Sequence, residues 1–280
     1  MQKKLFGIFL LAITVGFTAC YQSEPPAINT EEKGDIAFSG YQWKIKSSAA
    51  GQVVGPGPNV FSRSLDNVWL DANNMLHLKI TKVGSQWRCS EVVSTKEFGY
   101  GTYIFTTASD LTTLNERAVL GLFTWNDYSF QTQGNSEIDV EFARWGDSSD
   151  TSLLTYSVQP VWFSQPGPYA ERTRRPAMQV SKLKKTCVHV FKWTADLVTW
   201  ASYEGEVYPT NSPPLCSWSY DKSNRTRQKL EGNQVSNPIV IPAPEDSTNV
   251  RFNLWLLNGQ GPANNNQAEV VIKDFRFIPL

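Results

Sequence analysis

Three carboxylate side chains occupy alternate positions in the segment GNSEIDVEF, residues 134–142. Glu137, Asp139 and Glu141 are separated by single apolar residues, and nothing basic stands among them. Residues two apart on a β-strand share a face, so the three carboxylates are expected to project together while the apolar residues pack on the other side. Like charges placed side by side are destabilising, which calls for a chemical reason.

Glycoside hydrolysis needs such carboxyl groups, because one acts as a nucleophile and another as a protonated acid. Neighbouring negative charge raises the pKa of one member and keeps it protonated. Four strand residues span roughly 13 Å between Cα atoms, whereas retaining enzymes hold the two carboxyl groups about 5–5.5 Å apart. The outer glutamates must therefore lean together, and the shorter aspartate suits the middle position.

Three other interpretations compete with hydrolysis. A solvated face would more often intersperse Lys or Thr among the acids. A calcium site could use three carboxylates, but ligands along one straight strand rarely close around an ion. The third is coincidence, since the pattern is short, and other segments must therefore agree with the motif.

Composition sets broad limits on the class of protein. The 280 residues include 26 basic and 26 acidic side chains, which gives no support for nucleic-acid binding or for a polybasic membrane surface. The 10 Trp, 10 Tyr and 15 Phe suit either a core or a groove lined with flat apolar rings. With 2 His and no Cys-x-x-Cys, a zinc site is not expected.

The N-terminus has the pattern of a secretory signal. Lys3 and Lys4 precede an apolar run and small residues, so residues 1–19 are predicted to be a signal peptide. Cys20 resembles the lipidated first residue of a bacterial lipoprotein; a plain signal peptide cut nearby is the alternative. Residues 20–35 are polar and without periodicity, which is typical of a linker. An extracytoplasmic protein is expected, anchored through lipid on Cys20 or otherwise secreted.

Three cysteines remain if Cys20 carries lipid. An odd number allows at most one internal disulfide and leaves one free thiol. Cys187 and Cys216 are the favoured pair, with Cys89 free.

Period-two alternation dominates from about residue 36 to residue 280, with no second linker, which predicts one domain. The segments that predict strands are 75–80, 102–107, 137–142, 187–193, 250–257 and 268–277. Residues 118–125 form a continuous apolar run, as expected of a strand buried on both faces. Many strands in one large domain predict an all-β sandwich of two antiparallel sheets.

Several segments resemble, in the same order, those of glycoside hydrolase family 16, the laminarinase and lichenase group. They are 87–95 with 98–103, the Glu-x-Asp-x-Glu motif at 137–141, 189–193 with 198–200, and Asn-Leu-Trp at 253–255. The resemblance implies a jelly roll with a concave substrate cleft and a retaining double displacement. It makes Glu137 the nucleophile and Glu141 the acid and base, with Asp139 steering the nucleophile.

Other residues are expected to bind substrate. Alternation puts Arg251, Asn253 and Trp255 on one face and Phe252, Leu254 and Leu256 on the other. A polar residue beside a Trp is what a sugar platform needs, although a half-exposed strand would show the same pattern. Glu91 matches a cleft position of the family. Trp125 could close a subsite or pack in the core.

Arg144 and Trp145 depart from the lichenase pattern and are predicted to lie by the cleft, where Trp145 forms a subsite wall or closes a loop. His189 is interpreted as a hydrogen-bonded structural histidine. Residues 160–185 are rich in Arg and Lys. This composition is typical of a solvated loop. If the residues border the cleft, they could instead bind an anionic polysaccharide.

These observations predict a monomeric endo-β-glycanase whose partner is a polysaccharide. The Glu-x-Asp-x-Glu motif has no extra residue before its last Glu, and in this it resembles the lichenase branch of the family more than the galactanases. The resemblance implies a β-1,3 or mixed β-1,3/1,4-glucan as substrate. Transglycosylation is an alternative, and so is a non-catalytic carbohydrate-binding surface protein on the same sandwich. No cofactor and no metal site are predicted; some members of the family carry a structural calcium, for which this sequence shows no recognisable set of ligands.

Overall fold

The computed structural model describes residues 34–50, 52–161, 172–223 and 239–280. The predicted signal peptide, Cys20 and nearly all of the linker lie outside these ranges. No helix among the described residues is both long enough and apolar enough to cross a membrane.

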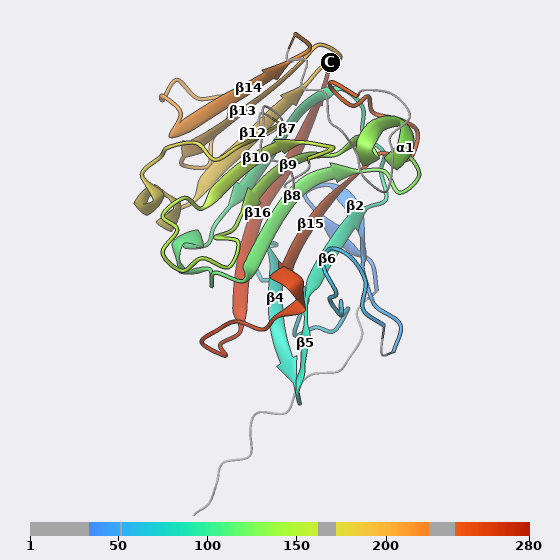
Figure 1. Cartoon of the computed structure of the whole chain (residues 1–280), viewed down its shortest axis with the longest axis vertical. Helices are drawn as coiled ribbons and strands as arrows, with labels where there is room; N and C mark the ends of the chain where they lie inside the picture. The colour runs from blue at the N-terminus through green and yellow to red at the C-terminus, as the bar shows by residue number, and fades with distance from the viewer. Residues whose placement is uncertain (1–33, 51, 162–171, 224–238) are drawn as a thin grey trace, which may run out of the picture.

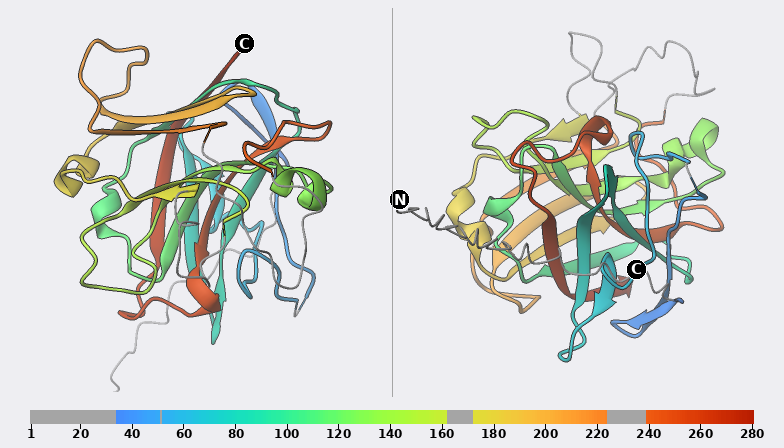
Figure 2. Two further views of the ribbon diagram at one scale, coloured as in Figure 1. Left: turned by 45° about the horizontal axis from the view of Figure 1, so that its top comes forward. Right: turned by 90° about the horizontal axis from the view of Figure 1, so that it is seen from below.

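Two antiparallel sheets form the body of the molecule (Figures 1 and 2). The first, called the site sheet, has the order β1 (Ile36–Phe38), β2 (Tyr41–Ile45), β6 (Ser90–Ser94), β15 (Asn249–Leu256), β8 (Ala118–Trp125), β9 (Ile138–Phe142), β10 (Leu154–Val158) and β11 (Thr173–Arg174). The second, the back sheet, has the order β14 (Cys216–Asp221), β13 (Leu197–Glu204), β12 (Cys187–Trp193), β7 (Gly101–Thr107), β16 (Ala268–Pro279), β4 (Leu76–Val83) and β3 (Val68–Leu70), and β5 (Gln86–Arg88) pairs with β4. The predicted jelly-roll sandwich is confirmed.

Helical structure is short in the described ranges. It comprises the helix α1 (Phe130–Gln133) and the 3-10 turns η1 (Leu111–Thr113), η2 (Gly134–Ser136), η4 (Val180–Lys184) and η5 (Leu257–Gly259). Both α1 and η2 lie in the connection from β8 to β9, immediately before the carboxylate segment.

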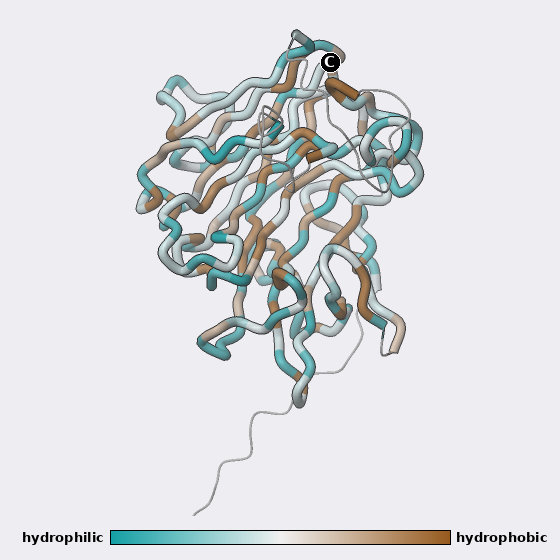
Figure 3. Tube along the Cα trace, viewed as in Figure 1, coloured by the Kyte–Doolittle hydropathy of each residue, from teal (hydrophilic) through white to brown (hydrophobic). Residues whose placement is uncertain are grey.

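An aromatic core fills the space between the sheets. Trp43 of the site sheet lies 4.6 Å from Phe252 and 5.8 Å from Phe275 of the back sheet, measured between ring centroids. Along β15 the alternate residues Phe252, Leu254 and Leu256 are fully buried. Burial of each such side chain contributes about 1.5–3 kcal/mol. Apolar and polar residues alternate along many strands, as Figure 3 shows, so one face of each packs inward.

The predicted disulfide between Cys187 and Cys216 is wrong, because both thiols are free, as is that of Cys89. Cys187 pairs with Glu204 on β13, whereas Cys216 pairs with Ser202 on the far side of that strand. Two strand spacings put the Cα atoms about 10 Å apart, beyond the roughly 7 Å that a disulfide can bridge. Burial raises the pKa of Cys89 to about 12 and that of Cys187 to about 11.

Thiol counting should reproduce this arrangement. A chain lacking residues 1–20 is expected to show three reactive thiols in denaturant without reductant, because Cys89, Cys187 and Cys216 are all unpaired. In the folded chain their reaction with a thiol reagent at pH 8 should be at least about a hundredfold slower, since buried thiols with raised pKa values hold little thiolate. A count of one thiol in denaturant would instead indicate a disulfide.

Candidate active site

Strand pairing places four residues in one row across the site sheet. Glu141 on β9 is opposite Gly121 on β8, Gly121 is opposite Asn253 on β15, and Asn253 is opposite Glu91 on β6. Directly opposed residues in antiparallel strands project from the same face. A Cβ atom on Gly121 would lie 2.5 Å from the Asn253 Oδ1 atom, so the absence of a side chain here leaves room for the amide.

A second row runs parallel to the first. Asp139 on β9 is opposite Phe123 on β8, which is opposite Arg251 on β15. Phe123 packs edge-on against Trp125, with ring centroids 6.3 Å apart. The two rows together bring residues distant in the sequence onto one surface.

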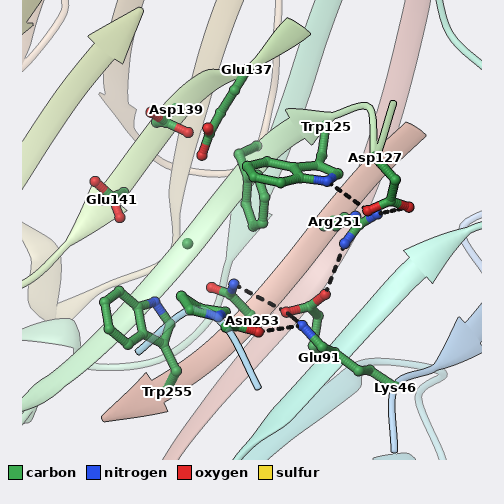
Figure 4. A pocket seen from close by; sticks show the side chains of 14 residues that line it. Lys46, Glu91, Trp125, Asp127, Glu137, Asp139, Glu141, Arg251, Asn253 and Trp255 are labelled. Atoms are coloured by element: carbon green, nitrogen blue, oxygen red, sulfur yellow. Dashed lines mark hydrogen bonds and ion pairs between the residues drawn. The ribbon is translucent and has the colours of Figure 1, made fainter. Parts of the chain in front are cut away.

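A cavity of about 280 Å³ lies over these rows, and Figure 4 shows the 14 residues that line it. Among them are seven of the residues singled out from the sequence: Glu91, Trp125, Glu137, Asp139, Glu141, Asn253 and Trp255. The acids of β9 lie along one side of the cavity, while Trp125 and Trp255 lie at different places along its rim (Figure 4). The structure therefore brings the predicted acids together with two aromatic rings.

Burial raises the pKa values of the three acids, and neighbouring negative charge adds to this rise for Glu137 and Glu141. Glu137 and Glu141 are half-buried, and Asp139 is 3% exposed. Burial is the main cause of the raised pKa of Glu137, and the negative charges of Asp139 and Glu141 add to it. Burial, then the charge of Asp139, raises the pKa of Glu141. A protonated carboxyl in this cluster can donate a proton near neutral pH.

Asp139 is held by several contacts. Burial raises its pKa to about 7, while hydrogen bonds from Gln159 and Glu137 oppose that rise. The Gln159 Nε2 group donates to Asp139 Oδ2 at 3.2 Å. The indole of Trp200, which belongs to the back sheet, donates to the Asp139 carbonyl at 3.0 Å. The middle of the carboxylate strand is thus fixed from both sides.

A chain of four charged residues forms the opposite wall of the cavity, here called the charged wall. Lys46 Nζ lies 3.0 Å from Glu91 Oε2, and Arg251 Nη1 lies 3.4 Å from Glu91 Oε1. Arg251 Nη2 also lies 2.8 Å from Asp127 Oδ2, whose partner oxygen accepts from the Trp125 indole at 2.8 Å. The positive charge of Arg251 opposes the rise in the pKa of Glu137 that burial and the neighbouring acids cause, whereas no cation among the described residues opposes the rise at Glu141.

Sequence reasoning missed Lys46 and Asp127 and gave Arg251 no role. The alternation along β15 does place Arg251 beside Asn253 and was a usable signal. Lys46 and Asp127 each lie just beyond the end of a strand, where no local sequence pattern indicates that they face the cavity.

Two other predicted residues lie outside the cavity lining. The Arg144 guanidinium donates to the backbone carbonyls of Leu114 at 2.7 Å, Thr112 at 3.2 Å and Asp150 at 3.2 Å. The N–H groups of Arg144 are therefore used to hold backbone segments together and do not face the cavity. Trp145 packs against Trp255, with ring centroids 6.4 Å apart, and lies beside the cavity.

His189 is a structural residue, as predicted. It is fully buried, its Nδ1 lies 2.8 Å from the Ser202 hydroxyl, and its Nε2 lies 3.2 Å from the Thr107 hydroxyl. Burial lowers its pKa to about 3, so the ring stays neutral.

The basic stretch 160–185 is described only in part, since residues 162–171 lie outside the described ranges. Arg172 is buried and donates to the carbonyls of Val158 and Gln159. Lys182 and Lys185 both pair with Glu204. None of the described cations of this stretch lines the cavity. Within the described residues no group of three or more His, Cys, Asp or Glu side chains is arranged to hold a metal ion.

The fold is that of solved β-glucanases. The chain superposes on a β-1,3-glucanase from Mycobacterium marinum with a TM-score of 0.56 and 16% identity, covering 92% of this chain and 100% of that one. For a Bacillus licheniformis β-glucanase the TM-score is 0.55 with 16% identity, covering 89% and 100%. A Mycobacterium tuberculosis protein described as an immunostimulatory antigen and pseudo β-1,3-glucanase gives 0.56 and 17%, covering 85% and 91%.

The molecule is thus a β-glucanase-type jelly roll. More particularly, it has the fold of glycoside hydrolase family 16, to which one matching Mycobacterium smegmatis structure is assigned. Comparison of the sequence with family models and with curated proteins finds no match.

The acid cluster should cost stability at neutral pH. Below about pH 3 the three acids are protonated in both the folded and the unfolded chain, and near pH 4 a glutamate of the unfolded chain is still mostly protonated. As the pH rises, the unfolded chain loses these protons first, because the folded pKa values are raised, so the free energy of unfolding falls. Glu141→Gln should therefore raise the Tm by about 2–6 °C at pH 7.5, and the gain should vanish near pH 4 in calorimetric scans.

Glu97→Gln, at an exposed carboxylate outside the cavity, is the matched control and should change the Tm little at either pH. A gain from Glu141→Gln that persisted unchanged at pH 4 would contradict an electrostatic origin.

Proposed function

We propose that the chain is an endo-acting, retaining β-glycanase that hydrolyses a neutral β-1,3 or mixed β-1,3/1,4-glucan. The observation that carries the proposal is the set of three acids with raised pKa values lining an open cavity beside Trp125 and Trp255. The tryptophan rings offer flat apolar surfaces for the C–H faces of sugar rings. The glucanase fold supports the same conclusion.

The two glutamates divide the work in a double displacement. Ionised Glu137 attacks the anomeric carbon while Glu141 gives its proton to the glycosidic oxygen, so the leaving sugar departs neutral. The product is an ester between Glu137 and the sugar. Glu141, now ionised, takes a proton from water, which attacks the anomeric carbon and releases Glu137. Overall configuration is retained because two inversions occur.

Asymmetry in the surroundings supports this assignment of roles. Burial and the charges of Asp139 and Glu141 raise the pKa of Glu137, and the positive charge of Arg251 opposes this rise, which favours the ionised form. The pKa of Glu141 is raised by burial and by Asp139, and no cation opposes the rise. A nucleophile needs the former setting and an acid the latter.

The charge of the cavity favours a neutral substrate. Five carboxyl groups line it against two cations, Lys46 and Arg251, and both cations are already paired with acids. A sulfated or uronic polysaccharide would be repelled here. The cavity therefore supports a glucan over an anionic glycan.

Transglycosylation uses the same carboxyl groups with a sugar hydroxyl in place of water. A non-catalytic binding protein is the rival from another class, and one protein of similar fold is described as a pseudo-glucanase. Incubation with laminarin, lichenan, agarose and carrageenan separates these cases. New reducing ends on laminarin or lichenan support the hydrolase, and binding without new ends on any polymer supports the lectin.

We propose further that the protein works outside the cytoplasm, tethered by lipid on Cys20. The signal-like N-terminus supports this. Cys20→Ala should move the protein from the membrane fraction to the soluble fraction of expressing cells, which fractionation and immunoblotting measure.

Glu137→Gln should reduce turnover of the preferred glucan by about 10³-fold or more, because the amide cannot form the ester intermediate. Polymer binding should stay within a few-fold of the original value, since the side chain keeps its size. Reducing-end assays and affinity electrophoresis measure the two quantities. Glu97→Gln is the control, and normal turnover in Glu137→Gln would show that the roles are misassigned.

Arg251→Gln should change the pH profile more than the maximal rate. Loss of the cation raises the pKa of Glu137, so the acidic limb of kcat/KM is expected to move to higher pH while the alkaline limb stays in place. Arg174→Gln, at an exposed arginine outside the cavity, should leave the profile unchanged. A uniform loss at every pH would mean that Arg251 acts only through structure.

A further inference from the structure

A second cavity, of about 250 Å³, has chemistry opposite to that of the first. It lies between strand β5 and two segments, 47–50 and 60–64, and is called here the serine–arginine pocket. Figure 1 shows β5 at the lower end of the molecule, next to β4. Arg63 and Arg88 line the pocket together with four serines, and no acidic side chain of the described residues lines it.

Arg88 is a cation without a counter-charge. Its Nε atom is buried and has no hydrogen-bond partner, and the guanidinium has no ion pair within the described residues. A buried donor left unpaired is costly, because it has given up water and received nothing in return. An arginine in this condition that faces a cavity is prepared to receive an acceptor.

Two hydroxyl groups are oriented to act as donors. The Ser48 hydroxyl accepts the backbone N–H of Phe61 at 2.9 Å, and the Ser62 hydroxyl accepts that of Ser64 at 3.2 Å. A hydroxyl that already accepts still has its own hydrogen to donate. No acceptor for these two hydrogens is found among the described residues, so they are available to a ligand.

We propose that the serine–arginine pocket binds an oxyanion, either sulfate-like or carboxylate, with Arg88 as its principal ligand. A planar guanidinium bonds such groups through two parallel N–H donors. Arg63 adds a second positive charge, and Ser48 and Ser62 add hydroxyl donors. The first cavity, by contrast, has an excess of acids and repels the same ligand.

Residues close together in the sequence line the two cavities. Lys46 lines the first and Ser47 the second, while Glu91 lines the first and Arg88 the second. Three strand residues span roughly 10 Å. The anion can therefore be either a free ion or a charged substituent of a glycan held in the first cavity.

Thermal unfolding in sodium sulfate, compared with sodium chloride at equal ionic strength, tests the site. Sulfate stabilises most proteins weakly and without saturation. The original chain should show an additional, saturable rise in Tm, as linkage to a bound ligand requires. Arg88→Gln should weaken the apparent sulfate affinity at least tenfold. Arg88→Lys keeps the positive charge but loses the paired N–H donors of the guanidinium, so its affinity should lie between those of the original chain and Arg88→Gln.

Arg174→Gln, the same change at an exposed arginine outside both pockets, should respond like the original chain. Because Arg88 has no partner to orphan, Arg88→Gln is expected to fold, and circular dichroism checks this. A saturable rise of equal affinity in Arg88→Gln, or no saturable rise in the original chain, overturns the proposal.

Calorimetry then identifies the source of the anion. A neutral β-1,3-gluco-oligosaccharide and the same compound carrying one sulfate are titrated into Glu137→Gln and into Glu137→Gln/Arg88→Gln. If the sulfated compound binds Glu137→Gln at least tenfold more tightly than the neutral one, and this difference disappears in the double variant, the anion is a substituent of a glycan. Equal binding of the two compounds, with inorganic sulfate still bound, assigns a free anion. These readouts need no turnover, so the site stands or falls separately from the proposed hydrolysis.

Discussion

Mutual repulsion among three acids on one strand face is the constraint around which this molecule is built. Burial and like charge disfavour the ionised cluster, so folding must supply free energy elsewhere. The inward residues Ile138, Val140 and Phe142 are fully buried, and each contributes about 1.5–3 kcal/mol. Phe142 also packs on the back-sheet ring of His189, with centroids 4.7 Å apart. The apolar face of β9 thus stabilises the folded state, and this offsets the destabilising effect of the acids on its other face.

Much of this could be predicted from the sequence, because side-chain alternation in a strand is local. It predicted that the acids share a face and that Phe252 and Leu254 point inward. It failed where the strand ends: β9 stops at Phe142, so alternation no longer places Arg144, and a φ of 53° at Trp145 then turns the chain. The failure with Cys187 has another cause, since strand neighbours are set by pairing, which spacing in the sequence does not reveal.

Pairing register is also why the composition of the cavity was only partly foreseen. The row from Glu141 through Gly121 and Asn253 to Glu91 joins four strands that are far apart in the sequence. Gly121 looked like one small residue in an apolar run, and its role as the open floor of the cavity emerges only from the strands on each side. The charged wall depends likewise on Lys46, which reaches Glu91 from the end of another strand.

A shared fold at 13–17% identity leaves the chemistry to individual side chains. Here the informative difference is electrical. The first cavity has an excess of acids, whereas the serine–arginine pocket holds unpaired Arg88 and no acid among the described residues. If the chain cleaves a glucan as proposed, a substrate that reaches both cavities would meet repulsion of negative charge at the reacting sugar and attraction at Arg88. The position of a charged substituent along the glycan would then affect binding, as well as the linkage between sugars.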